Sequence, residues 1–178
     1  VNDPGFRNIN FDELKSDYYS CIDALIQGGV DIVFVETIFD TLNSKAALIA
    51  INEYEKKNKK KIPLMISVTI TDLSGRTLSG QTLEAFYYSV IFSKPISIGL
   101  NCALGPKELE QYVAELSRIC TVYTSVHSNA GLPNAFGEYD ETPKKMANFA
   151  ENWANNSYIN IIGGCCGTTP THIKAIKD

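Results

Sequence analysis

Several features that would place the protein in a membrane or on nucleic acid are absent. No apolar stretch approaches the ~20 residues needed to cross a bilayer, and the first residues lack the pattern of a signal peptide. The 16 lysines and arginines are outnumbered by 20 aspartates and glutamates, so the net charge is −4. Nucleic acids and anionic membrane surfaces reward basic proteins, so we expect neither as the main partner. These absences favour a cytoplasmic protein.

Cysteine is too sparse and too irregularly spaced for a disulfide scaffold, which favours metal or thiol chemistry. The five cysteines are Cys21, Cys102, Cys120, Cys165 and Cys166. Cys21 lies on the apolar stripe of the first predicted helix, so we expect it in the core, where free cysteine behaves as a small hydrophobic residue. Cys120 closes another predicted helix and is expected to be structural.

No linker or shift of composition divides the chain, which predicts one domain over residues 1–178. Predicted strands begin near residues 31, 63, 97, 121 and 158, and helical patterns separate them. Regular alternation of strand and helix predicts a parallel sheet with right-handed crossovers. The fold class is therefore α/β.

Side chains suited to chemistry fall at or just beyond the carboxyl ends of the predicted strands. They are Glu36, Asp72, Cys102, His127, Cys165 and Cys166. In a parallel sheet these ends share one edge, and in a (β/α)8 barrel that edge is the catalytic face. The sequence therefore predicts a site assembled from several strands.

The cysteine pair belongs to a predicted strand-to-helix loop near the C-terminus. Residues 159–163 form an apolar strand, and we expect Gly163 and Gly164 to let the backbone turn sharply as it ends. Thr169 and Pro170 then start a helix. Ligands commonly bind at such loops, whereas structural cysteine prefers the core.

Cys102 could converge with Cys165 and Cys166 in a curved parallel sheet. Three soft ligands suit zinc, and three protein ligands leave its fourth tetrahedral position open, as in catalytic sites. Two alternatives stay open at this point. The vicinal pair could serve a tight turn or form a strained disulfide, and His127 or His172 could close a structural zinc site.

The charge of such a site indicates its use. Three thiolates on Zn²⁺ leave a net charge of about −1, which is poor for activating water but keeps a bound thiolate nucleophilic. That chemistry suits alkyl transfer to sulfur. Glu36 on the same edge could hold an ammonium group, or it could serve a surface or loop-capping role.

Two short segments resemble the zinc-binding signature of homocysteine S-methyltransferases: residues 99–102 (GLNC) and 163–168 (GGCCGT). Three longer stretches resemble more narrowly the homocysteine-binding region of cobalamin-dependent methionine synthases. These stretches are residues 36–43, 71–81 and 129–140. Ser128 stands where the family often has proline, a departure that leaves the cysteines untouched.

The resemblance implies that the three cysteines bind zinc and that homocysteine sulfur takes the fourth position. The thiolate would attack a methyl group of methylcobalamin carried on another module, giving methionine. Glu36 would contact the substrate amino group, and Asn101 would also belong to the substrate site. Cobalamin- and folate-binding modules would be partners. A zinc-binding module without catalysis, or a remnant barrel, is the alternative.

The family fold is a (β/α)8 barrel, of which this chain shows five strand-helix units. We therefore expect the C-terminal five units of an incomplete barrel. Such a sheet has two unpaired edges, so we expect self-association, and we expect residues 1–178 alone to be inactive.

Overall fold

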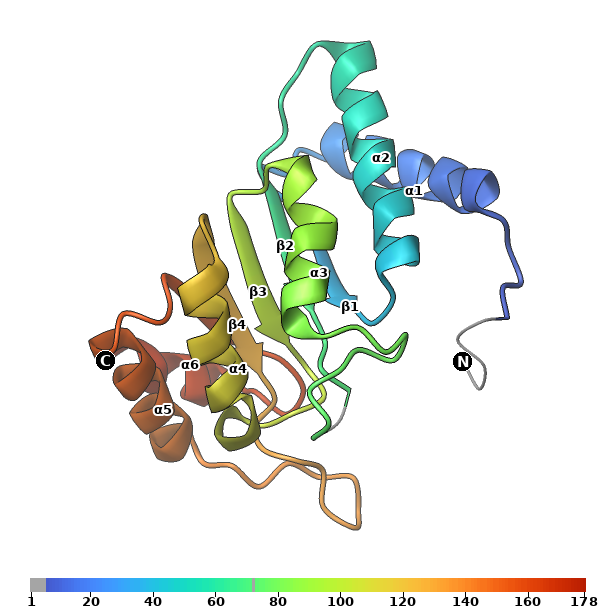
Figure 1. The fold of residues 1–178 in the computed structure, drawn as a ribbon. Coiled ribbons are helices and arrows are strands. Elements are labelled where there is room, and N and C mark those ends of the chain that lie inside the picture. The colour runs from blue at the N-terminus through green and yellow to red at the C-terminus, as the bar shows by residue number, and fades with distance from the viewer. Residues whose placement is uncertain (1–5, 72) are drawn as a thin grey trace.

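The computed structural model describes residues 6–71 and 73–178, so the predicted site residue Asp72 lies outside the described part. The strands are β1 (Val33–Ile38), β2 (Leu64–Val68), β3 (Ser97–Asn101), β4 (Tyr123–Ser128) and β5 (Ile161–Gly164). The helices are α1 (Phe11–Gln27), α2 (Thr41–Asn58), α3 (Leu83–Val90), α4 (Pro106–Ile119), α5 (Pro143–Asn155) and α6 (Pro170–Lys177), with a short 3₁₀ turn at Ile91–Ser93 (Figure 1). In this part of the chain, no helix has the length and apolarity that a bilayer span requires.

The helices begin where the capping residues predict. Asn10 and Glu13 form a capping box at the start of α1. The helices α4, α5 and α6 each have proline in the first turn, where its missing N–H costs nothing. Local side-chain chemistry thus sets the point at which each of these helices leaves its loop.

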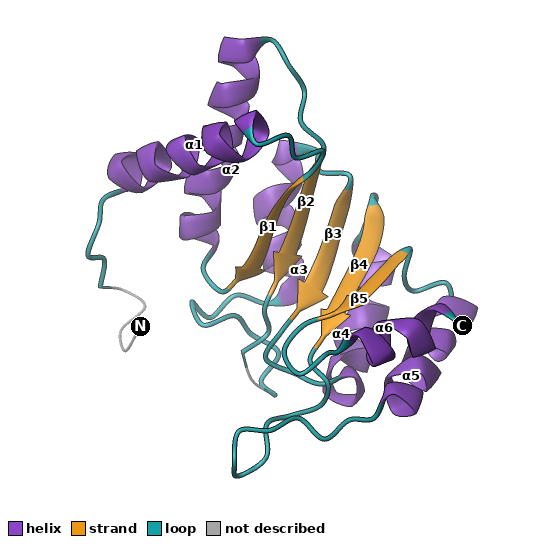
Figure 2. Cartoon of the chain, turned by 180° about the vertical axis from the view of Figure 1, so that it is seen from behind, coloured by secondary structure: helices purple, strands orange, loops and turns teal. Residues whose placement is uncertain are grey.

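The five strands form one parallel sheet in the order β1-β2-β3-β4-β5. Figure 2 shows all arrowheads pointing toward the end of the sheet where the connecting loops gather. The predicted alternation of strand and helix is confirmed. Within the described residues β1 pairs only with β2 and β5 only with β4, so the sheet is open at both edges.

The two faces of the sheet differ in chemistry because side chains alternate along each strand. One face is apolar and fully buried, and it carries Ile66, Val68, Ile98, Leu100 and Val126. The registers place small or polar residues on the other face, which would line the inside of a barrel: Ser67, Gly99, Asn101, Ser125 and His127. The apolar face stabilises the fold, and the polar face leads toward the strand ends where the chemistry lies.

Cys21 is exposed, and its predicted place in the core is wrong. Helix α1 buries only Ile22 fully, and it turns Tyr18 and Ile26 toward the core beside that residue. Cys21 and Leu25 lie on the other flank of the apolar stripe, and Leu25 is 44% exposed. Helical periodicity identified the apolar stripe, but only the side of the stripe with Ile22 packs against the core.

Residues 1–178 are expected to self-associate through the open sheet edges, since unpaired N–H and C=O groups of an edge strand pair readily with another chain. Ile32, 45% exposed just before edge strand β1, offers a test. Ile32→Lys should weaken association several-fold, because a charge beside the edge opposes pairing. Light scattering over a range of protein concentrations measures this.

The matched control is Tyr88→Lys, at a residue of α3 that is 64% exposed and away from both edges. It should leave the association unchanged. A monodisperse monomer of the unmodified chain at all concentrations would contradict the prediction.

Candidate metal centre

Three of the five cysteines converge at the carboxyl edge of the sheet. The Sγ atoms of Cys102, Cys165 and Cys166 all lie within 4.8 Å of one another, and 3.7 Å separates Cys102 Sγ from Cys166 Sγ. Tetrahedral ligands at the usual Zn–S distance of about 2.3 Å lie about 3.8 Å apart, so these thiols fit a zinc ion. All five cysteines are free, so the vicinal disulfide considered from sequence is not formed.

The end of β3 turns sharply to bring Cys102 to this point. Cys102 has φ 62° and Ala103 has φ 56°, values that non-glycine residues rarely adopt. The Leu104 N–H donates to the Cys102 carbonyl at 2.7 Å, which closes the turn. The Cys102 N–H donates to the carbonyl of His127 in β4 at 3.1 Å, so the turn is anchored to the neighbouring strand.

The end of β4 holds the cysteine pair through backbone hydrogen bonds. The Cys165 N–H donates to the Ser128 carbonyl at 2.8 Å, and the Ala130 N–H donates to the Cys166 carbonyl at 2.9 Å. The Cys166 N–H donates to Oδ1 of Asn129 at 3.1 Å, and Asn129 is buried. Both cysteines are therefore positioned by their main chain, which leaves the thiols available.

Glycine is required at positions 163 and 164, before the cysteine pair, for a different reason from the one that the sequence predicted. Gly163 and Gly164 do not have positive φ; the sharp turn falls on Gly167, with φ 77°. A Cβ at Gly163 would lie 2.6 Å from His127, and one at Gly164 would lie 2.2 Å from the Thr168 hydroxyl. The first two glycines thus permit close packing, and only the third permits the turn.

Neither histidine joins the thiol cluster, which argues against a closed structural site. His172 Nδ1 accepts from the Thr169 N–H at 3.1 Å, and its Nε2 contacts the Glu141 carbonyl at 2.8 Å, so the ring braces the start of α6. His127 packs its ring against Phe34 with centroids 5.5 Å apart. Burial lowers the pKa of His127, and the nearby Glu36 carboxylate opposes this shift in part.

Tyr139 is a neighbour of the thiols that the sequence did not single out as a site residue. Its side chain packs on Gly167, where an added Cβ would lie 2.4 Å from it. Burial, followed by the interaction with the Cys166 thiol, raises the pKa of Tyr139. No local sequence signal marks the contact, because the loop of residues 129–140 reaches the cysteines only through folding.

Glu36 stands at a bulge at the end of β1. The register with β2 shifts between Val35 and Ile38, so Glu36 and Thr37 together lie opposite the single residue Ser67. Bulges re-aim side chains and are frequent beside functional sites. Glu36 is exposed, and within the described residues no hydrogen bond or ion pair ties up its carboxylate.

Asn101, expected from the resemblance in the substrate site, lies fully buried beneath the strand ends. Its Oδ1 accepts from the Thr37 N–H at 2.9 Å and from the Ser67 hydroxyl at 2.6 Å. Its Nδ2 donates to the Thr37 hydroxyl at 2.8 Å. The side-chain amide thus links three strands behind the site.

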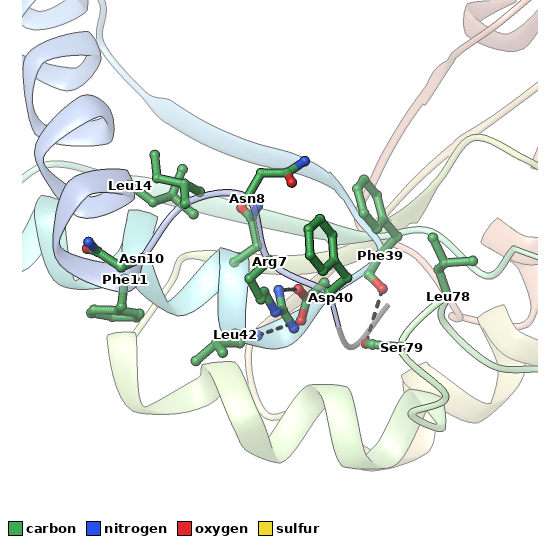
Figure 3. A pocket seen from close by; sticks show the side chains of 13 residues that line it. Arg7, Asn8, Asn10, Phe11, Leu14, Phe39, Asp40, Leu42, Leu78 and Ser79 are labelled. Carbon is green, nitrogen blue, oxygen red and sulfur yellow. Dashed lines mark hydrogen bonds and ion pairs between the residues drawn. The ribbon is translucent and has the colours of Figure 1, made fainter. Parts of the chain in front are cut away.

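A cavity of about 660 Å³ lies to one side of the cysteines, and none of its lining residues is a cysteine or Glu36. Figure 3 shows it between the segment that leads into α1, the start of α2 and the loop containing Leu78 and Ser79. Arg7 forms an ion pair with Asp40 in its wall, and the Ser79 hydroxyl donates to the Phe39 carbonyl at 3.2 Å. The cavity is mainly apolar, and its walls offer no cluster of metal ligands.

Parallel strands alternating with helices, with reactive side chains at their carboxyl ends, define this chain as part of a TIM-barrel protein with a cluster of three thiols that could hold a metal ion. The model of the family described as homocysteine S-methyltransferase matches residues 1–178, so the chain belongs to that family. The family resemblance noted in the sequence is therefore confirmed.

Solved structures of the homocysteine methyltransferase MmuM from Escherichia coli share the fold. The metallated form is 20% identical with a TM-score of 0.78, and the match covers 97% of this chain and 53% of that one. The apo form is 19% identical with a TM-score of 0.76 and coverage of 97% and 58%. The oxidized form is 19% identical with a TM-score of 0.78. The chain therefore spans about half the length of the structures it matches, as an incomplete barrel predicts.

Replacing any one of the three clustered cysteines with serine should lower zinc affinity by more than about a hundredfold, because a neutral hydroxyl replaces a soft thiolate. Zinc per chain, measured by atomic emission after dialysis, should fall from one to near zero. The matched controls are Cys21→Ser and Cys120→Ser, which remove thiols outside the cluster and should leave one zinc. Retention of zinc in Cys102→Ser together with its loss in His127→Gln would contradict the assignment.

Zinc binding to the metal-free protein should release protons. Burial, followed by the charge of Cys102, raises the pKa of Cys165 to about 11, so this thiol keeps its proton at neutral pH. Only the thiolate binds metal, so the apparent zinc affinity should rise with pH through the neutral range. Calorimetric titration in two buffers of different ionisation enthalpy measures the protons released. Identical heats in both buffers would contradict the expectation.

Proposed function

We propose that this chain is the zinc- and homocysteine-binding part of a methyltransferase that converts homocysteine to methionine, with methylcobalamin on another module as the methyl donor. The observation that carries the proposal is the convergence of the three thiols within 4.8 Å at the strand ends of a chain of this family. The methionine synthase type rests on the three longer sequence stretches.

The thiol cluster sets the charge of the site. Zinc, when bound, would lower the pKa of a substrate thiol and keep its sulfur as a nucleophilic thiolate. Cys102, Cys165 and Cys166 would hold the metal and leave one tetrahedral position for the substrate. Because three thiolates on Zn²⁺ leave a net charge of about −1, the substrate sulfur would retain electron density for attack on a methyl group.

Glu36 would bind the substrate ammonium group. Its carboxylate is exposed and lies close enough to His127 to act on the pKa of that imidazole, so it faces the polar side of the sheet. A fixed ammonium group would orient the aliphatic chain of homocysteine toward the cysteines, and such positioning contributes to rate. Burial lowers the pKa of His127, which favours the neutral imidazole and so disfavours a cation that would compete for the carboxylate.

Asn101 would act from behind the site, since its side chain is buried and already hydrogen-bonded. Asn129 would hold Cys166 through its N–H, and Tyr139 would cover the neighbouring Gly167 beside the thiol. These residues orient the groups that touch the substrate.

A zinc-binding module without catalysis is the second candidate, and metal content alone does not separate the two. The exposed Glu36 carboxylate on the same edge as the thiols favours the enzyme, because a structural zinc needs no ammonium-binding group. The product of the complete gene should transfer the methyl group of free methylcobalamin to homocysteine. A zinc-loaded protein without methyl transfer from any donor would support the module.

Glu36→Gln should raise the homocysteine KM about ten- to a hundredfold, since a hydrogen bond to a charged group is worth about 1.5–3 kcal/mol. The kcat should change less, and the zinc content should stay at one. Steady-state kinetics on the product of the complete gene measures this. The matched control is Glu151→Gln, at an exposed carboxylate on α5, which should have wild-type kinetics. Loss of zinc in Glu36→Gln would refute the assigned role.

A further inference from the structure

The backbone at Thr37, directly after Glu36, has an unusual conformation. Thr37 has φ 55°, a left-handed value that normally favours glycine, and it occupies the extra position of the β1 bulge. Glycine would meet the backbone requirement more easily. The presence of threonine at this position therefore indicates that its side chain makes an interaction that glycine could not make.

Thr37 and Asn101 form two reciprocal hydrogen bonds. The Thr37 N–H donates to Asn101 Oδ1 at 2.9 Å, and Asn101 Nδ2 donates back to the Thr37 hydroxyl at 2.8 Å. The two bonds close a ring between residues 64 positions apart in the chain. A ring of this kind fixes the backbone and the side chain of Thr37, and Glu36 is attached one residue earlier.

Asn101 is itself fixed on every side. It is fully buried, and its Oδ1 also accepts from the Ser67 hydroxyl at 2.6 Å. Its carbonyl accepts from the Thr69 hydroxyl at 3.0 Å. The next residue is Cys102, whose left-handed turn begins directly from this anchored position. The buried Asn101 thus directly precedes Cys102 in the chain. Two hydrogen bonds join its side-chain amide to Thr37, which lies in the bulge that carries Glu36.

We propose that Asn101 is a positioning residue that, through Thr37, sets Glu36 at a fixed place relative to Cys102. The inference rests on the proposed function and deepens it. The distance between the ammonium group and the sulfur of homocysteine is bounded by its short carbon chain. A carboxylate held rigidly relative to the thiols therefore selects a thiol substrate with an amino group at that separation.

Thr37 is the better position for a test than Asn101, because removing Asn101 would strip partners from several buried groups at once. Thr37→Val keeps the β-branched shape and the N–H but removes the acceptor for Asn101 Nδ2. Thr37→Ser keeps the hydroxyl and is the matched control. A second control, Ser67→Ala, removes a bond to Asn101 Oδ1 but leaves both bonds between Asn101 and Thr37.

Binding of two thiols to the zinc-loaded product of the complete gene is measured by calorimetry. The probes are homocysteine and 4-mercaptobutanoate, which has the same carbon chain and thiol but no amino group. Thr37→Val should weaken homocysteine binding roughly tenfold and 4-mercaptobutanoate binding less than about twofold, because only homocysteine uses Glu36. Zinc content should stay at one. Thr37→Ser and Ser67→Ala should keep the wild-type ratio of the two dissociation constants.

A double-mutant cycle separates positioning from general destabilisation. In a Glu36→Gln background, Thr37→Val should cause no further loss of homocysteine binding, since Thr37 acts through the carboxylate. Equal weakening of both thiols by Thr37→Val, or an additive loss in the double variant, would overturn the proposal while leaving the proposed function intact. Failure of the wild-type protein to bind either thiol would overturn the proposed function and the positioning role together.

Discussion

The parallel register of the sheet is the constraint on which the candidate site depends. Asn101 of β3, His127 of β4 and Gly163 of β5 lie in one row across three strands. The residues that follow each of them emerge from the same edge at nearly the same height. Cys102 and Cys166, 64 positions apart in the chain, therefore end with their sulfurs 3.7 Å apart. A slip of one residue would turn the inward side chains to the other face.

Stability and chemistry are divided between the two faces of the sheet. The apolar side chains of β2 and β3 that face the helices, such as Ile66 and Leu100, are completely buried. The opposite face carries small and polar groups, and these continue into the hydrogen bonds that arrange the strand ends. This alternation lets one strand contribute a core side chain and a site residue without conflict, because the period of two separates them.

Much of the fold and part of the site could be predicted from the sequence. Capping residues located the helix starts, and apolar runs located the strands, because both signals act over a few neighbouring residues. The three clustered cysteines also followed from strand-end positions. The exposure of Cys21 could not be predicted, because periodicity shows that a helix has an apolar stripe but not how much of that stripe packs against other elements. Gly163 and Gly164 were misread for a similar reason: their contacts with His127 and Thr168 exist only after folding.

The sequence by itself determined the order of strands and helices, the residues available at the strand ends and the membership of the homocysteine S-methyltransferase family. Tertiary structure alone decided how those residues meet. It placed Thr37 in a bulge and held it with Asn101, brought Asn129 and Tyr139 to Cys166, and left both histidines outside the thiol cluster. Local patterns report on interactions within about one helical turn, whereas these contacts join strands far apart in the chain. Their geometry follows from the register and curvature of the sheet as a whole.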